Sequence, residues 1–262
     1  MTYSAMRLER EDGLVRLIFC QPARGNPIDG TFCAEFCDVA NELSSDPTVR
    51  AILVTAEGRN FSFGGDIAMF LQNLDALPMQ IRKWTADLHM GIARMQRLDA
   101  PIVAAVQGIC AGGMAGMIAG ADIIVAESST RFVAAYAGIG YCCDAGSSIM
   151  LSRRMGLARA RKYLLLNETL DAQTALAAGL CDEVVESEAV LARAEAIARQ
   201  LASGPTAAYG EIRRLLVSAA SEPMDAQLER EAQGLARIAG TADAREGLTA
   251  FGEKRKARFI GR

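Results

Sequence analysis

Apolar and polar positions follow two alternating patterns along the first two-thirds of the chain. Short apolar runs rich in β-branched residues, at 49–55, 102–106 and 123–125, are typical of strands buried in a parallel sheet. Apolar residues at helical spacing over 32–43 and 79–98 predict amphipathic helices between these strands. The last third of the chain has the helical pattern almost throughout. We therefore expect an α/β core followed by a helical C-terminal part.

Turn and capping residues delimit these elements. Asp12-Gly13 joins two strand patterns near the N-terminus and is typical of a β-hairpin. Asp29 is placed to cap the first long helix. Gly204-Pro205 and Glu222-Pro223 interrupt the last third, which is therefore expected to form several separate helices.

A glycine-dense stretch, 101–127, lies at the centre of the chain. Its apolar flanks predict two strands, and a helix is expected to begin at Gly112 or Gly113 and to direct unpaired backbone N–H groups outward. The uncharged run 101–121 is also long enough to span a membrane, and its small residues could form a helix seam. A glycine turn with a purely structural role is a third alternative. The glycine content of this run and the amphipathic character of the rest of the chain argue against a membrane-spanning segment.

Composition narrows the class of protein. The chain has 262 residues, of which 51% are hydrophobic, and this is enough for one sizeable core. The net charge of −3, with no Lys/Arg run before the C-terminal end, argues against a nucleic-acid partner. The odd number of cysteines and the absence of an apolar N-terminal segment indicate reduced thiols in the cytoplasm. A single histidine excludes His-rich metal sites, and neither GxGxxG nor the P-loop motif occurs.

Five motifs, taken together, resemble those of the crotonase superfamily, the enoyl-CoA hydratase/isomerase group. They are Asn26-Pro27-Ile28, the loop 61–67 (FSFGGDI), the turn of 104–108 (AAVQG) with 111–113 (AGG), Ala121-Asp122-Ile123, and the C-terminal segment 246–256 (EGLTAFGEKRK). Each motif alone is weak, but their order and spacing make the resemblance specific.

The resemblance implies an α/β fold, with a crotonase-like spiral of ββα turns expected over residues 1–200. A C-terminal helical trimerisation region is expected over residues 201–262. The implied substrate is an acyl-CoA, in which coenzyme A is part of the substrate thioester, and no permanently bound cofactor is expected. The expected assembly is a homotrimer or a hexamer formed by two trimers. Nucleic acids and membranes are not expected partners.

The resemblance also assigns the chemistry that these proteins share. The backbone N–H groups of Gly65 and Gly113 are implied to stabilise the oxyanion that forms on the thioester, and one such preorganised donor can contribute about 3 kcal/mol. The two glutamates that hydratases use for water addition are replaced by Gly116 and Tyr136. Because water addition needs a base and an acid placed together, ordinary hydration is not expected.

One carboxylate remains at a catalytic position of related branches. Asp144 matches the catalytic aspartate of dienoyl-CoA isomerases, of the ring-epoxide isomerases of phenylacetate breakdown, and of 4-chlorobenzoyl-CoA dehalogenases. His89 is at the catalytic histidine position of the dehalogenases, and Tyr136 is where those enzymes have tryptophan. Simpler interpretations also stand: Asp144 as a helix cap, His89 as an ordinary exposed histidine, Tyr136 as pocket lining, and Cys142 and Cys143 as apolar filler.

Residues for binding the substrate follow from the same resemblance. Contacts with coenzyme A are implied for Arg24, Ser62, Gly64, Asp66, Ile67, Phe251 and Lys254, the last two reaching a neighbouring subunit. The acyl group is expected to lie against the segment 71–88 together with Tyr136, Tyr141 and His89.

Three hypotheses about function follow. In the first, an acyl-CoA isomerase, Asp144 removes a proton from the acyl chain and returns it to another carbon. In the second, Asp144 attacks a ring carbon of an aroyl-CoA, and His89 activates water to hydrolyse the ester. In the third, the protein binds CoA thioesters with little or no activity of its own.

Overall fold

The computed structural model describes residues 2–72 and 74–262, and its centre is a six-stranded sheet. The strand order is β1-β2-β3-β4-β6-β9; β1 runs antiparallel to β2, and all other neighbours are parallel. The strands are β1 (Met6–Glu11), β2 (Leu14–Phe19), β3 (Ala51–Ala56), β4 (Ile102–Val106), β6 (Ile123–Glu127) and β9 (Glu183–Val185). The predicted α/β class is confirmed.

A second sheet of three short strands lies beside the end of the first. Its order is β5-β7-β8, and its strands are β5 (Ile109–Ala111), β7 (Arg131–Val133) and β8 (Thr169–Asp171). Strands of three residues are too short to show a period of two, so the pattern of apolar positions did not reveal β5, β8 or β9.

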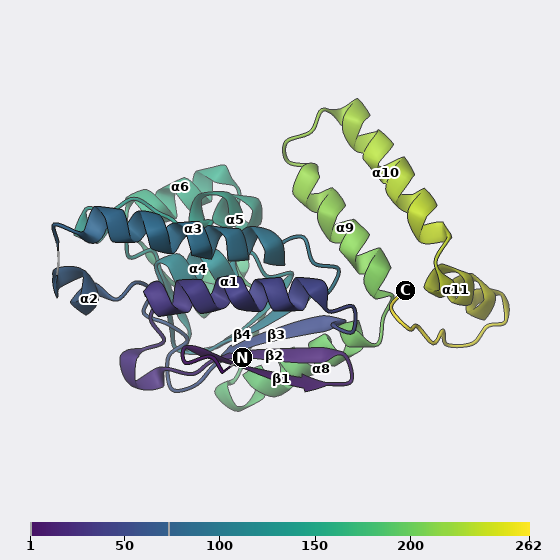
Figure 1. Cartoon of the computed structure of the whole chain (residues 1–262), viewed down its shortest axis with the longest axis horizontal. Helices are drawn as coiled ribbons and strands as arrows, with labels where there is room; N and C mark the ends of the chain where they lie inside the picture. Colours follow the sequence, from purple (N-terminus) through teal and green to yellow (C-terminus); the bar gives the residue numbers. More distant parts are fainter. Residues whose placement is uncertain (1, 73) are drawn as a thin grey trace.

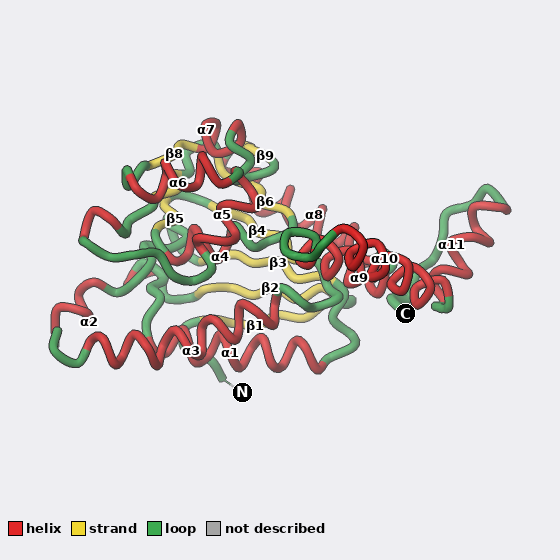
Figure 2. The backbone as a smooth tube through the Cα atoms, turned by 90° about the horizontal axis from the view of Figure 1, so that it is seen from above, coloured by secondary structure: helices red, strands yellow, loops and turns green. Residues whose placement is uncertain are grey.

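Helices cover both faces of the large sheet. Helices α1 (Gly30–Ser45) and α3 (Leu77–Met95) lie side by side over one face with α4 (Gly113–Ile118), and α8 (Val190–Ala202) covers the other (Figures 1 and 2). Alternate residues of each parallel strand face the two layers, as in β3, where the Ile52 and Leu53 side chains belong to the α1 and α8 layers respectively.

Shorter helices complete the core around these layers. They are η1 (Pro22–Arg24), α2 (Ile67–Gln72), η2 (Ala137–Ile139), α5 (Ser147–Met155), α6 (Leu157–Leu165), α7 (Ala172–Ala177) and η3 (Ser187–Ala189). The expected cap is confirmed, because the Asp29 carboxylate accepts a hydrogen bond of 2.9 Å from the Phe32 N–H.

The glycine-dense stretch folds as β4, β5, α4 and β6, so neither a membrane span nor a single helix seam is present there. Within residues 2–72 and 74–262, no helix combines the length and the apolar character needed to cross a membrane.

Three helices form a C-terminal arm that projects from the core on the side opposite α2 (Figures 1 and 2). The arm consists of α9 (Thr206–Ser218), α10 (Met224–Ala239) and α11 (Ala242–Gly252). Several large apolar side chains of the arm are exposed in the single chain: Ile212, Leu216, Met224, Leu228, Leu235, Leu248 and Phe251.

Arg213 of α9 anchors the arm to the core. Its buried guanidinium pairs with the Asp122 carboxylate at 2.9 Å and donates to the carbonyl oxygens of Met95 and Ala100, each at 3.1 Å, and of Leu98. Asp122 in turn accepts from the N–H of Ile102 at 2.7 Å, at the start of β4. One side chain therefore joins the arm, the end of α3 and two strands of the sheet.

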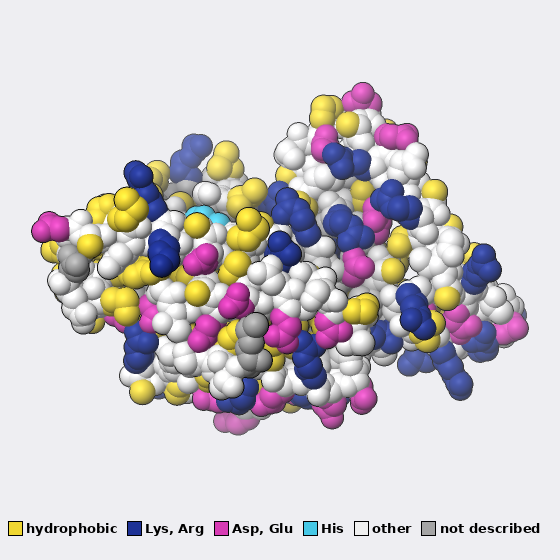
Figure 3. Space-filling model, viewed as in Figure 1, with side chains coloured by type: hydrophobic (Ala, Val, Ile, Leu, Met, Phe, Trp, Pro, Cys, Tyr) yellow, Lys and Arg dark blue, Asp and Glu magenta, His cyan; other side chains and the backbone are white. Residues whose placement is uncertain are grey.

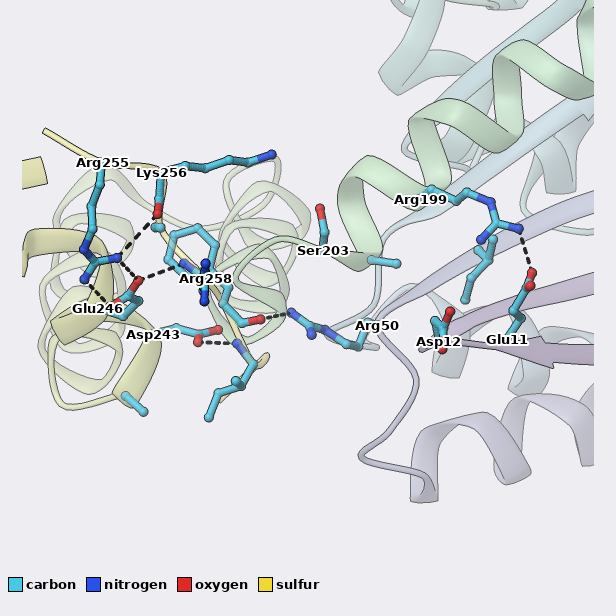
Figure 4. Close-up of a pocket in the computed structure, with 16 residues that line it drawn as sticks. Glu11, Asp12, Arg50, Arg199, Ser203, Asp243, Glu246, Arg255, Lys256 and Arg258 are labelled. Carbon is cyan, nitrogen blue, oxygen red and sulfur yellow. Dashed lines mark hydrogen bonds and ion pairs between the residues drawn. The ribbon is translucent and has the colours of Figure 1, made fainter. Parts of the chain in front are cut away.

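The last residues of the chain form a second connection between core and arm. Arg50 donates to the carbonyl oxygens of Gly204 at 2.7 Å and Phe259 at 3.2 Å, and the buried Asp243 carboxylate accepts from the N–H groups of Ile260 and Gly261, both at 2.7 Å. Figure 4 shows Arg50 pointing from the core toward the C-terminal residues, across a cavity of about 1210 Å³.

We expect Arg213→Ala to lower the free energy of unfolding by about 3 kcal/mol, because a buried cluster of acceptors loses its donor. Arg230→Ala is the matched control: the ion pair of Arg230 with Glu222 is at the surface of the same arm, and its loss should cost less than about 1 kcal/mol. Urea unfolding followed by circular dichroism measures both. Equal effects of the two substitutions would contradict the anchoring role.

Candidate active site

Two loops meet at the end of the parallel strands. The loop that follows β3 adds to β5 through three main-chain hydrogen bonds of 3.0 Å: from Phe61 N–H to Gln107 O, from Ser62 N–H to Ile109 O, and from Ala111 N–H to Ser62 O. This pairing holds the FSFGGDI loop against the glycine turn. Segments about fifty residues apart in the sequence are thereby placed in contact.

Glycines make this contact possible. Gly64 has a φ of +83°, and a Cβ atom there would lie 2.8 Å from the carbonyl oxygen of Ala111. The next residue, Gly65, and the first residue of α4, Gly113, both border one large cavity. In the described part of the chain neither the Gly65 nor the Gly113 N–H donates a hydrogen bond to the protein. Two residues whose main-chain N–H groups have no protein acceptor among the described residues therefore border the same space.

The cavity has a volume of about 830 Å³ and is mostly apolar. The expected acyl-binding segment contributes Leu74, Leu77, Ile81, Trp84 and Leu88 to its lining. Aromatic rings form part of the wall: the Phe70 ring stacks on Trp84 with centroids 6.1 Å apart and on Tyr141 at 6.3 Å. Figure 3 shows hydrophobic side chains gathered over this end of the molecule, around α2 and the start of α3.

Asp144 is the only charged residue that lines this cavity within residues 2–72 and 74–262. One carboxylate oxygen, Oδ1, accepts a hydrogen bond of 2.7 Å from the Tyr136 hydroxyl. A Cβ atom at Gly113 would lie 3.3 Å from the same oxygen, so Asp144 is adjacent to one of the two free main-chain donors. The sequence-predicted residues Gly65, Gly113, Tyr136 and Asp144 are thus brought together.

Tyr136 is a hydrogen-bond donor to Asp144 at any ordinary pH. Burial, and then the negative charge of Asp144, raise the pKa of the Tyr136 hydroxyl well above its usual value. The Ser147 Oγ atom lies 3.1 Å from this hydroxyl, and the Tyr136 N–H donates to Asn167 Oδ1 at 3.1 Å. These contacts fix the ring beside the carboxylate.

The position of the first hydratase glutamate, Gly116, has no room for a side chain. A Cβ atom there would overlap the buried Ser147 of α5, whose Cα would be 2.7 Å away. Helices α4 and α5 therefore pack where an acid would otherwise enter the site.

His89 does not line the apolar cavity. Its imidazole is exposed, and its Nε2 atom accepts a hydrogen bond of 3.2 Å from the N–H of Ala145. It borders a second cavity of about 740 Å³ on the other side of the 141–146 loop. This placement corrects the expectation that His89 helps to bind the acyl group.

Two of the expected coenzyme A contacts are engaged within the protein. Arg24 pairs with Asp29 at 2.8 Å and with Asp66 at 2.6 Å, so its charge is already matched by two carboxylates. Ser62 is fully buried, and its hydroxyl donates to the carbonyl oxygen of Asn26 at 2.7 Å and accepts from the Gly64 N–H at 3.0 Å. Ser62 therefore shapes the loop and is not available to a ligand.

The other expected contacts are distributed over the molecule. Gly64 is buried against the glycine turn, and Asp66 accepts from the N–H of Met69 at 2.9 Å and so caps α2. Ile67 is half-exposed and lines the cavity. Phe251 lies in α11 and Lys254 directly follows this helix, and Figure 2 shows α11 at the end of the molecule opposite α2.

Sequence reasoning missed three residues of the site. Asn167 adopts a φ of +51° and holds the Tyr136 main chain; an asparagine before a short strand was the available signal. Ser147 at the start of α5 gave no signal. Cys33 of α1 lines the cavity, and burial raises the pKa of its thiol to about 12, so it is a neutral wall residue.

Known proteins are similar to this chain along nearly its whole length. A model of the enoyl-CoA hydratase/isomerase family matches residues 9–262. The 1,2-epoxyphenylacetyl-CoA isomerase of Escherichia coli (strain K12) is 33% identical over 259 residues, which cover 96% of this chain and 97% of that protein. The 4-chlorobenzoyl coenzyme A dehalogenase-1 of Arthrobacter sp is 31% identical over 248 residues, covering 94% and 90%.

A solved structure agrees with the sequence relatives. The crystal structure of an enoyl-CoA hydratase from Polaromonas sp. JS666 superposes with a TM-score of 0.92 at 27% identity, covering 98% of this chain and 100% of that one. Similarity therefore extends to proteins named for isomerisation, dehalogenation and hydration. The chain has the crotonase fold and belongs to the enoyl-CoA hydratase/isomerase family of acyl-CoA enzymes.

Proposed function

We propose that this enzyme is an acyl-CoA isomerase in which Asp144 moves a proton along the acyl chain. The observation that carries the proposal is a single carboxylate in an otherwise uncharged cavity, next to two free main-chain donors. A double-bond shift needs one group that removes a proton and returns it elsewhere. It needs no second acid, because no water is added.

The chemistry would proceed through an enolate. The Asp144 carboxylate takes a proton from a carbon of the acyl group, and the C–H electron pair moves toward the thioester, whose oxygen becomes negative. The N–H groups of Gly65 and Gly113 would donate to this oxygen, because both border the cavity and neither has a protein acceptor. Asp144 then returns the proton to a different carbon.

The geometry favours this reaction over the two alternatives. Hydration would need a second acid, but Tyr136 and the crowded Gly116 occupy the two glutamate positions. Hydrolysis of an Asp144 ester would need His89 as the base, but the Nε2 atom of His89 already accepts a hydrogen bond from the Ala145 N–H.

We propose further that the arm assembles the enzyme into a homotrimer or a dimer of trimers. Met224, Leu228 and Leu235 lie four and seven positions apart on α10 and are 79%, 56% and 72% exposed in the single chain. Such a stripe is stable in water when another subunit covers it. In such an assembly Phe251 and Lys254 would be placed near the coenzyme A of a neighbouring subunit.

The first prediction concerns Asp144. In D₂O, the enzyme should exchange acyl-chain protons of 2-enoyl or 3-enoyl CoA thioesters, and Asp144→Asn should slow this exchange by at least about 100-fold because the base is lost. Mass spectrometry of the recovered thioesters measures the uptake. Asp87→Asn on α3 is the control, since Asp87 lines neither cavity.

Full isomerase activity in Asp144→Asn would refute the role. A covalent adduct on Asp144 after incubation with 4-chlorobenzoyl-CoA would instead support the nucleophilic hypothesis. Binding of thioesters without any turnover would support an inactive binding protein.

The second prediction concerns Tyr136. Tyr136→Phe removes the hydrogen bond that holds the Asp144 carboxylate beside Gly113, so the rate of acyl-proton exchange should fall about 10-fold because the base is less well positioned. The D₂O assay measures this rate, and thioester binding should change little. Tyr141→Phe is the control, because Tyr141 lines the same cavity without bonding Asp144. An unchanged exchange rate in Tyr136→Phe would show that this hydrogen bond does not position the base.

The third prediction concerns the arm. Leu235→Arg should reduce the particle mass measured by light scattering from that of an oligomer to the 27.9 kDa of one chain, because a charge is placed in the apolar stripe. Leu165→Arg is the control; Leu165 on α6 is 69% exposed and lies outside the arm. An unchanged mass for Leu235→Arg would exclude this stripe as the interface.

A further inference from the structure

The loop that carries Asp144 is a partition between two cavities. Tyr141 and Cys142 line the apolar cavity of about 830 Å³, whereas Cys143 and Gly146 line the second cavity of about 740 Å³. Asp144 is the only residue, within residues 2–72 and 74–262, that lines both. We call the second cavity the rear cavity. Asp144, the proposed base, therefore borders both cavities.

The two cavities differ in character. The rear cavity has a more polar lining than the apolar cavity and lies between α3, α5, α9 and α10. Its polar lining residues are His89, Gln96, Arg97, Ser148, Arg153, Arg214, Ser218, Ser221, Glu222 and Arg230. A space of this size with many hydrogen-bonding groups holds water. Ser148 and Arg153 are exposed, so the rear cavity opens to solvent.

The charged residues that line the rear cavity also distinguish it from the apolar cavity. Arg230 pairs with Glu222 at 2.6 Å, and Arg214 pairs with carboxylates outside the rear cavity. Arg97 and Arg153 donate to main-chain carbonyl oxygens and have no carboxylate partner in the described part of the chain. Water and small ions beside Asp144 therefore lie in a positive field.

We propose that the rear cavity is the path by which Asp144 exchanges its proton with solvent while the acyl group fills the apolar cavity. The inference rests on the proposed isomerase reaction. After proton removal, the proton is bound to a carboxylate oxygen of Asp144. The electron pair of the broken C–H bond remains with the enolate. Water in the rear cavity exchanges with this O–H group before the proton returns. The isomerised product accordingly carries a hydrogen from solvent.

The experiment fills the rear cavity and leaves the apolar one unchanged. Ala93 on α3 lines only the rear cavity, and Ala93→Phe places a ring in it. Ala86→Phe is the matched control: the same substitution on the same helix, at an exposed residue that lines neither cavity. Ser148→Phe, which enters the rear cavity from α5, is an independent second variant.

The measurement is the fraction of isomerised product that carries deuterium after turnover in D₂O. Wild type and Ala86→Phe should give mostly deuterated product. Ala93→Phe and Ser148→Phe should retain isomerisation and return the substrate's own hydrogen, so the deuterated fraction should fall several-fold. Circular dichroism and thioester affinity confirm that each variant is folded.

Two results would overturn the inference. One is a wild-type product that already carries the substrate's hydrogen. The other is a deuterated fraction that is the same in all folded variants, or that falls equally in Ala86→Phe. Failure of the proposed function is a separate result, because the wild-type enzyme would then show neither isomerisation nor exchange.

Discussion

The site depends on a close contact between two segments of main chain. The loop after β3 approaches β5 and the turn before it so closely that a Cβ atom at Gly64 or Gly108 would collide with a carbonyl oxygen. This contact places the N–H groups of Gly65 and Gly113 on one cavity. Because the donors belong to the backbone, their positions are set by the pairing of strands and need no side chain to hold them. The parallel sheet behind them supplies the rigidity.

A single carboxylate then defines what the cavity can do. Asp144 is held by Tyr136, and packing of α4 against α5 closes Gly116 to any second acid. The relatives named for isomerisation, dehalogenation and hydration show that one scaffold carries several reactions. In this chain Ser147 occupies the space that a side chain at position 116 would need.

The sequence allowed much of this arrangement to be predicted, for physical reasons. Glycines mark places where backbone approaches backbone, and the resemblance of their motifs to those of the enoyl-CoA hydratase/isomerase group is what assigned Gly65 and Gly113 to the site. The contacts of side chains whose partners lie far along the chain could not be predicted in this way. The pairing of Arg24 with two carboxylates, the burial of Ser62 and the position of His89 outside the apolar cavity depend on tertiary contacts that leave no local pattern.

The connection between Arg50 and Phe259 closes a very long loop of chain. Arg50 donates to a carbonyl oxygen 209 residues further along the sequence, whereas Asp243 accepts from residues only 17 and 18 positions away. Closing so long a loop costs conformational entropy before the contact contributes any stabilisation. We therefore expect the sheet and its covering helices to order first during folding, and the direction of the arm to be fixed last.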